Sequence, residues 1–168
     1  MWIRFVVVFF AFVMMAPLQA QTVGEKAKLN HVDLYDGTRF DPKTVEGKPT
    51  LIYFWASWCP ICRRELPMLE KRFQSYKDKG LNVIAINFRD EPAKAKALLY
   101  TVRPISFPVG DINENWRGDY PKLYGTPTWI LLDKKGIIRK VVVGQEVITG
   151  GWFDGLEDDL KKVLAEGS

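Results

Sequence analysis

The chain divides into nearly continuous apolar runs of five to eight residues and longer stretches in which apolar residues recur at three- and four-residue steps. The continuous runs predict strands buried on both faces, and they cover residues 50–55, 81–88 and 129–133. The periodic stretches predict helices with one apolar side, and they cover residues 63–79 and 152–165. Residues 91–102 are expected to form a further helix.

Turn residues predict how these elements are joined. Asp36-Gly37 lies between short apolar segments and predicts an N-terminal β-hairpin. Lys135-Gly136 predicts a second hairpin that leads into a strand over 137–143. Because strands and helices alternate before that closing hairpin, we expect an α/β fold with a central mixed sheet flanked by helices on both faces.

The first twenty residues differ in kind from the rest. Arg4 supplies a positive charge, 5–16 is an uninterrupted apolar run, and Ala20 is a small residue at its exit. These are the parts of a secretory signal peptide, and the run is shorter than the ~20 residues of a bilayer span. We therefore expect a signal peptide over 1–20 and a periplasmic or otherwise extracytoplasmic protein, with an uncleaved membrane anchor as the alternative.

The remaining 148 residues suit one domain with a full hydrophobic core. We expect a flexible polar leader over 21–28 and one domain over 29–168. Cleavage would remove one basic and no acidic residue, which lowers the net charge from +4 to +3. The basic residues are interspersed rather than clustered, so nucleic-acid binding is not expected.

Both cysteines of the chain lie in one motif, Trp58-Cys59-Pro60-Ile61-Cys62. Two thiols cannot build a four-sulfur metal cage, and His31 is the sole histidine, so no metal and no cofactor are expected. A static disulfide across two residues would constrain little of the unfolded chain. The pair therefore indicates reversible thiol–disulfide chemistry.

The position of the motif predicts different roles for the two thiols. Cys59 falls where a buried strand gives way to a helix, whose first turn stabilises a negative charge. Its pKa should therefore fall below that of a free thiol, and the thiolate attacks a disulfide. Cys62 lies one helical turn further on and is expected to resolve the mixed disulfide.

Two segments carry a family resemblance. Residues 54–67, from Phe54 through the cysteines to Pro67, and the segment Tyr124-Gly125-Thr126-Pro127-Thr128 resemble the TlpA-like family of exported thioredoxin-like proteins. The resemblance spans about residues 29–165 and implies a thioredoxin-like fold. It further implies a cis peptide bond at Pro127 beside the disulfide, with Thr126 hydrogen-bonding an extended substrate segment.

The resemblance also assigns candidate roles beside the cysteines. Trp58 would shelter the edge of the disulfide, although a simple core aromatic is an equal alternative, and Pro60 is counted with Trp58 in the substrate groove. Glu65 matches an acidic position of the family and is a candidate proton relay, with an exposed helix carboxylate as the alternative. Tyr53 and Thr128 stand where related proteins carry acidic residues, which leaves water or Glu65 as the base.

We therefore expect an enzyme, an exported thiol–disulfide oxidoreductase. Its expected role is to reduce disulfides of partner proteins, with cytochrome c maturation as one candidate pathway and a membrane thiol donor as its source of electrons. The alternatives are an oxidant or isomerase, since Pro60-Ile61 must tune a reduction potential that sequence does not give. A peroxidase and a binding module without turnover are further alternatives.

Overall fold

The structure is a computed structural model that describes residues 22–120, 123–144 and 152–166, with side chains from Leu156 onward in the last segment. The predicted signal peptide over 1–20 lies outside the described residues. One five-stranded sheet has the order β5-β4-β3-β6-β7. Its strands are β3 (Thr50–Trp55), β4 (Asn82–Asn87), β5 (Val109–Asp111), β6 (Thr128–Leu132) and β7 (Ile138–Val143). The central strand β3 pairs parallel with β4 and antiparallel with β6, so the sheet is mixed as predicted.

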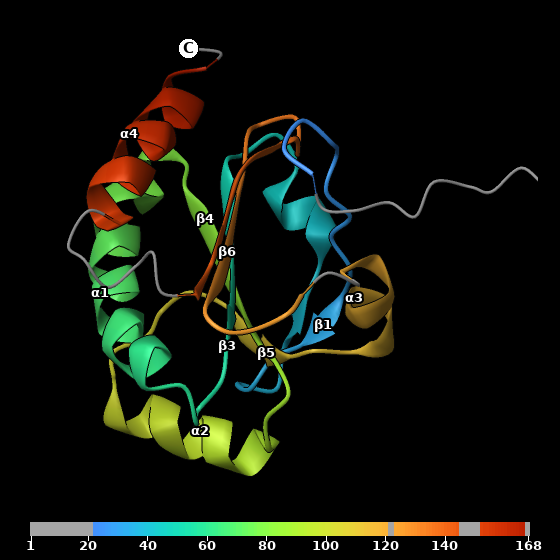
Figure 1. Ribbon diagram of the computed structural model, residues 1–168, viewed down its shortest axis with the longest axis vertical. Helices are drawn as coiled ribbons and strands as arrows, with labels where there is room; N and C mark the ends of the chain where they lie inside the picture. The colour runs from blue at the N-terminus through green and yellow to red at the C-terminus, as the bar shows by residue number, and fades with distance from the viewer. Residues whose placement is uncertain (1–21, 121–122, 145–151, 167–168) are drawn as a thin grey trace, which may run out of the picture.

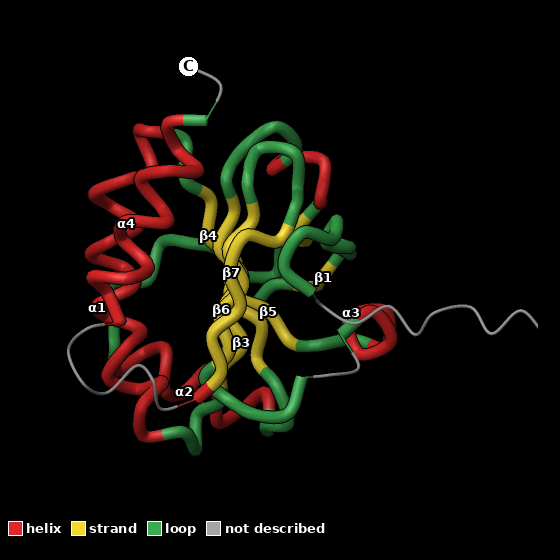
Figure 2. Tube along the Cα trace, turned by 45° about the horizontal axis from the view of Figure 1, so that its top comes forward, coloured by secondary structure: helices red, strands yellow, loops and turns green. Residues whose placement is uncertain are grey.

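Helices and a small hairpin cover the two faces of this sheet. The α-helices are α1 (Pro60–Tyr76), α2 (Pro92–Thr101), α3 (Glu114–Asp119) and α4 (Trp152–Ala165). α1 and α4 lie side by side on one face, and α3 lies on the opposite face with the hairpin of β1 (Val32–Asp33) and β2 (Arg39–Phe40) (Figure 1). Figure 2 shows the strands between these layers. This arrangement confirms the predicted thioredoxin-like class with its N-terminal hairpin.

Side chains of β3 alternate between two cores, which is why its sequence is apolar at every position after Thr50. Tyr53 and Trp55 pack with residues of α1, α2 and α4, whereas Ile52 and Phe54 pack with the hairpin and α3. All four are 0% exposed. A strand that is covered on both faces has no position for a solvated polar side chain.

The main helix begins earlier than its apolar period predicts. We expected it from residue 63, but α1 begins at Pro60, with Cys59 as its N-cap. A proline is tolerated at the first helical position because its missing N–H has no partner there. The helix continues past Pro67, passes into a 3₁₀ turn over Lys77–Lys79, and ends at Gly80, whose φ is 97°.

The predicted leader is tied to the domain over part of its length. Gly24 donates its backbone N–H to Ile138 at 2.8 Å, and Ala27 donates to Gly136 at 2.9 Å. Lys26 and Ile137 also form an isolated antiparallel bridge. Described residues 24–27 therefore extend the fold beside the β6–β7 turn instead of forming a free leader.

No helix in the described part of the chain is long and apolar enough to cross a membrane. Within the same residues, no group of three or more histidine, cysteine or acidic side chains is placed to hold a metal ion.

Gly110 of β5 approaches the N-terminal hairpin too closely for a side chain. A Cβ atom there would lie 2.6 Å from the carbonyl oxygen of Asp33 and 3.0 Å from a methyl group of Val32. Gly110→Ala should therefore lower the free energy of unfolding by about 1–3 kcal/mol, because the backbone must shift. Urea unfolding checks this beside Gly118→Ala, whose Cβ would meet nothing within 4 Å. Equal midpoints for the two variants would contradict the close packing.

Candidate active site

The two cysteines are joined as a disulfide at the start of α1. Cys59 caps the helix, and the backbone N–H of Cys62 donates to its Sγ at 3.1 Å. Cys59 is 3% exposed and Cys62 is 0% exposed, so both residues are buried, with Cys59 at the end of the helix. This geometry is that required for attack by Cys59 and resolution by Cys62, roles that stay predictions.

The loop before β6 reaches the same edge of the sheet. The Thr126–Pro127 bond is cis, as the family resemblance predicts. Phe54 pairs with Thr128 in the antiparallel register, which brings Pro127 next to the end of β3 and hence to the loop that carries Cys59. Pro127 is buried and Thr126 is partly exposed. Because of the register of β3 and β6, both segments of the resemblance meet at one end of the sheet.

Exposed apolar side chains flank this end. Trp58 is 58% exposed and Tyr124 is 74% exposed. The indole Nε1 of Trp58 donates to the backbone oxygen of Arg89 at 2.9 Å, which holds the ring at the surface beside the cysteines. The core-aromatic alternative for Trp58 is therefore wrong. Its predicted role in sheltering the disulfide, and the roles of Pro60 and Thr126 in binding, are not tested by this geometry.

Glu65 is buried, and the exposed-carboxylate alternative for it is wrong. The residue is 3% exposed and lies on the inner side of α1, one turn after Cys62. The hydroxyl of Tyr53 donates to its Oε2 at 2.9 Å. In this pair the strand β3 supplies the hydrogen-bond donor and the helix α1 supplies the carboxylate.

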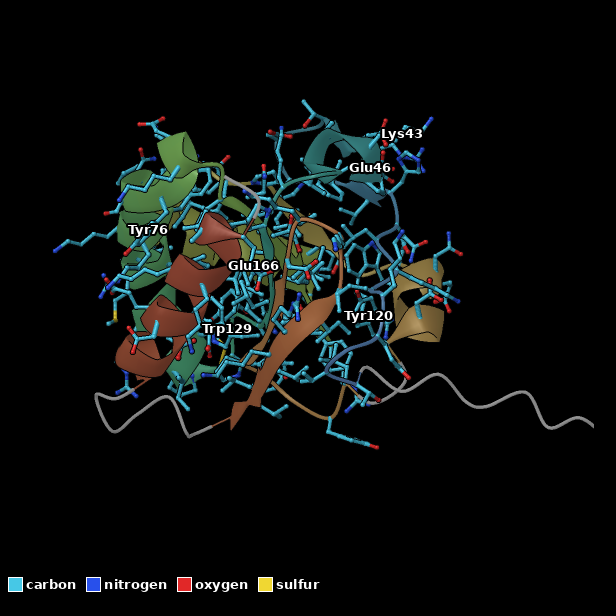
Figure 3. The ribbon with its side chains drawn as sticks, turned by 90° about the horizontal axis from the view of Figure 1, so that it is seen from above. Lys43, Glu46, Tyr76, Tyr120, Trp129 and Glu166 are labelled. Atoms are coloured by element: carbon cyan, nitrogen blue, oxygen red, sulfur yellow. A yellow bond between two sulfur atoms is a disulfide. The ribbon has the colours of Figure 1, made fainter. Side chains whose placement is uncertain are left out.

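Burial changes the acidity of this carboxyl group. Loss of solvation raises the pKa of Glu65 from its ordinary 4.5 to about 7, although the hydrogen bond from Tyr53 favours its ionised form. Trp129, labelled in Figure 3, belongs to the same core cluster as Leu66 of α1. Its ring centroid lies 4.0 Å from that of Tyr53. Glu65 can therefore bind or release a proton near neutral pH, beside the thiol expected to resolve.

Thr128 plays a local structural part. Its Oγ1 donates to the carbonyl oxygen of Gly125 at 2.7 Å, which closes the turn that carries Thr126 and Pro127. The Thr128 side chain therefore stabilises the loop before β6.

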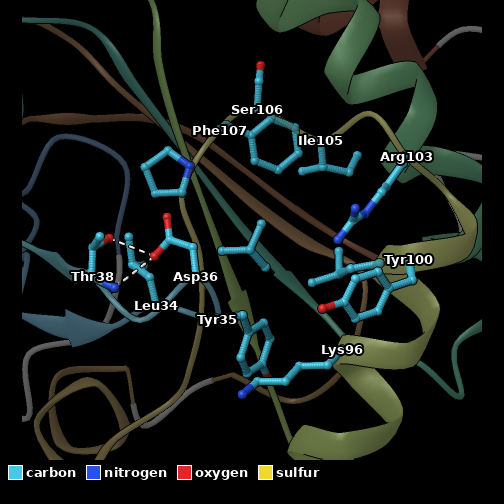
Figure 4. Close-up of a pocket in the computed structure, with 13 residues that line it drawn as sticks. Leu34, Tyr35, Asp36, Thr38, Lys96, Tyr100, Arg103, Ile105, Ser106 and Phe107 are labelled. Carbon is cyan, nitrogen blue, oxygen red and sulfur yellow. Dashed lines mark hydrogen bonds between the residues drawn. The ribbon is translucent and has the colours of Figure 1, made fainter.

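A separate cavity of about 420 Å³ lies between the N-terminal hairpin and the end of α2 (Figure 4). Tyr35 and Lys96 form one wall, with Tyr100 and Arg103 beside them, and neither cysteine lines it. Neither this cavity nor the second cis bond, at Arg103–Pro104, was predicted from the sequence.

Known proteins place this geometry in a family. The model of the AhpC/TSA family matches residues 23–141. The chain is 30% identical over 144 residues to "Thiol-disulfide oxidoreductase ResA" of Bacillus thuringiensis, with 84% of this chain and 78% of that protein covered. It is 35% identical over 107 residues to "Thiol:disulfide interchange protein DsbE" of Pseudomonas aeruginosa, with 63% and 57% covered.

A solved structure agrees in fold. The crystal structure of a thiol:disulfide interchange protein from Chlorobium tepidum, described as a thioredoxin family protein, superposes with a TM-score of 0.73 at 24% identity. It covers 87% of this chain and 100% of that one. These relatives are consistent with the resemblance to TlpA-like proteins, and their names match the chemistry of the paired cysteines. The chain belongs to the AhpC/TSA family and is a thiol–disulfide oxidoreductase of the ResA and DsbE type, built on a thioredoxin-like fold.

Proposed function

We propose that this oxidoreductase works outside the cytoplasm as a reductase of disulfides in partner proteins. In the first step the Cys59 thiolate attacks a partner disulfide, which forms a mixed disulfide and releases one partner thiolate. In the second step Cys62 loses its proton and attacks Cys59, which releases the second partner thiolate and closes the Cys59–Cys62 disulfide. A membrane thiol donor then returns two electrons and two protons to the pair.

The observation that carries the reducing direction is the buried carboxyl group of Glu65. A carboxylate that ionises near pH 7 opposes a negative charge on Cys62, which lies one turn before it in α1. A stable thiolate would stabilise the reduced, dithiol form of the pair, and a nearby carboxylate makes the thiolate less stable than a nearby cation would. The reduced form is therefore less stabilised, which favours its oxidation by a partner disulfide. The same carboxylate supports a role for Glu65 as acceptor of the proton that Cys62 must lose.

The proposed place of action rests on the sequence, and the proposed partner groove rests on the sequence together with the strand register. The apolar run and small exit residue within 1–20 support export. Trp58, Pro60, Thr126 and Pro127 form the proposed groove for an extended partner segment, because their two loops meet at one edge of the sheet. Cytochrome c maturation is one pathway in which such a reductase would act.

Trapping of partners tests the proposal. Cys62→Ala keeps the attacking thiol and removes the resolving one, so covalent complexes should accumulate in the extracytoplasmic fraction, joined through Cys59. A Cys59→Ala/Cys62→Ala double variant is the matched control. Absence of complexes, or complexes with cytoplasmic proteins alone, would contradict the proposal. Rapid turnover of hydrogen peroxide by the wild type would favour the peroxidase alternative, and full cellular function of Cys59→Ala would favour the binding module.

A further inference from the structure

The loop that carries the cysteines is held by the loop that follows the neighbouring strand. β3 and β4 run parallel, so the residues after them emerge at the same edge of the sheet. Ala56–Trp58 follows β3 and leads directly to Cys59; we call it the active-site loop. Phe88–Glu91 follows β4 and leads into α2; we call it the β4–α2 turn. The backbone N–H of Phe88 donates to the carbonyl oxygen of Trp55 at 2.8 Å and keeps the two loops together.

Both carboxylate oxygens of Asp90, in the β4–α2 turn, accept hydrogen bonds from the active-site loop. Its Oδ2 accepts the backbone N–H of Ser57, and its Oδ1 accepts the Ser57 hydroxyl at 2.9 Å. The side-chain amide of Asn87 donates to Oδ2 at 3.0 Å, and the backbone N–H of Glu91 donates to Oδ1 at 2.8 Å. Each oxygen therefore accepts two hydrogen bonds, one from the active-site loop and one from the end of β4 or the turn that follows it.

These four donors require an ionised carboxylate. They hold the pKa of Asp90 below its ordinary value although burial opposes this. An asparagine would turn an NH₂ group toward two donors on one of its edges, so it could not replace the aspartate. The carboxylate therefore acts as an acceptor on both sides of the junction between the two loops.

The residue before Asp90 holds the next residue of the active-site loop. Arg89 has φ 52°, the one positive value among non-glycine residues in the described segments, and its carbonyl oxygen accepts the Trp58 indole N–H. A left-handed conformation is unfavourable for an arginine. Two consecutive residues of the β4–α2 turn thus bind two consecutive residues of the active-site loop, immediately before the predicted nucleophile.

We propose that Asp90 is a positioning residue, which holds Ser57 and thereby keeps the Cys59 sulfur aligned with the first turn of α1. The inference rests on the proposed attack by Cys59. If the loop were released, Sγ would lose its alignment with the Cys62 N–H and with the positive end of the helix, both of which favour the thiolate. The expected result is a higher thiol pKa for Cys59 and slower exchange.

Asp90→Glu is the informative variant, because it keeps the negative charge and displaces it by one methylene group. Asp133→Glu is the matched control. Asp133 is a buried carboxylate that, like the partly buried Asp90, accepts backbone N–H groups, those of Lys135 and Ile137, but it lies at the other end of the sheet. Ser57→Ala removes only one of the four bonds of Asp90 and serves if Asp90→Glu does not fold.

The experiment uses the full chain with Cys62→Ala, so that Cys59 is the one thiol, and measures its alkylation by iodoacetamide as a function of pH. Asp90→Glu should raise the pH of half-maximal alkylation and slow the reaction at pH 7 about ten-fold. Ser57→Ala should slow it about two- to three-fold. Asp133→Glu should lower the melting temperature and leave the alkylation profile unchanged.

Wild-type profiles for both Asp90→Glu and Ser57→Ala would overturn the inference, as would equal shifts in Asp90→Glu and Asp133→Glu. Alkylation needs no partner protein and no direction of electron flow. A wild type that fails to reduce partners, with the Asp90→Glu shift still present, would therefore refute the proposed function alone.

Discussion

Cys59→Ala should abolish disulfide exchange, whereas Cys62→Ala should keep its first step. Cys59 caps α1 and is the cysteine that retains a small exposed fraction, 3%, so we expect its thiolate to be the one that attacks a partner disulfide. Cys62 is fully buried and can reach only Cys59. The rate constant for reduction of a small disulfide should fall at least about a thousand-fold in Cys59→Ala.

Stopped-flow kinetics with an aromatic disulfide and mass spectrometry of the products check these two variants. Cys62→Ala should react once at a rate within about ten-fold of the wild type and then hold the partner sulfur on Cys59. A mixed disulfide found on Cys62 of Cys59→Ala, formed at a comparable rate, would reverse the two assignments.

Glu65→Gln should make the protein more stable above neutral pH and less active. The pKa of Glu65 is raised in the folded state from 4.5 to about 7, so the folded state holds a proton that the unfolded state loses. The free energy of unfolding therefore has its full value, as far as Glu65 is concerned, below pH 4.5. It falls as the pH rises to about 7 and stays low above that pH. Glutamine does not ionise, so the variant should lack this fall, which amounts to about 3 kcal/mol for a shift from 4.5 to about 7.

Activity should change in the opposite sense, because glutamine cannot accept the Cys62 proton. We expect exchange to slow about a hundred-fold and its dependence on pH near 7 to flatten. Tyr53→Phe keeps the carboxylate but removes a donor to its ionised form, so the pKa of Glu65 and the pH midpoint of activity should rise.

Glu70→Gln is the control for these measurements. Glu70 is the other buried carboxylate of α1, and it accepts from the backbone N–H and hydroxyl of Ser106 in the loop before β5. This variant should lose stability through that loop and retain the wild-type pH profile. A wild-type profile in Glu65→Gln would remove Glu65 from the mechanism.

The strands and helices follow from sequence because each depends on a local pattern. β3 is apolar at every position but its first, since both of its faces are covered, and α4 runs over Trp152–Ala165 as its period predicts. The early start of α1 was missed because the apolar period of the helix begins after its cap. Cys59 as the N-cap and Pro60 at the first helical position mark the start of the helix through end chemistry, which the apolar period does not include.

The site itself was only partly predictable. The burial of Glu65 could have been read from its position three residues after Cys62 and four before Leu69, both on the apolar side of α1. The residues around Glu65 could not be predicted, because Tyr53 and Trp129 come from separate strands and meet only in the folded sheet. The hydrogen bonds from Ser57 to Asp90 could not be predicted for the same reason, since they depend on the parallel register of β3 and β4.

The direction of electron flow is the central claim, and the reduction potential of the Cys59–Cys62 pair tests it most directly. Equilibration of the full chain with glutathione or dithiothreitol buffers, read out by alkylation of free thiols, gives this potential. The account predicts a reducing value near that of thioredoxin, about −270 mV. A value near about −120 mV, typical of a strong disulfide oxidant, would contradict the proposed reductase.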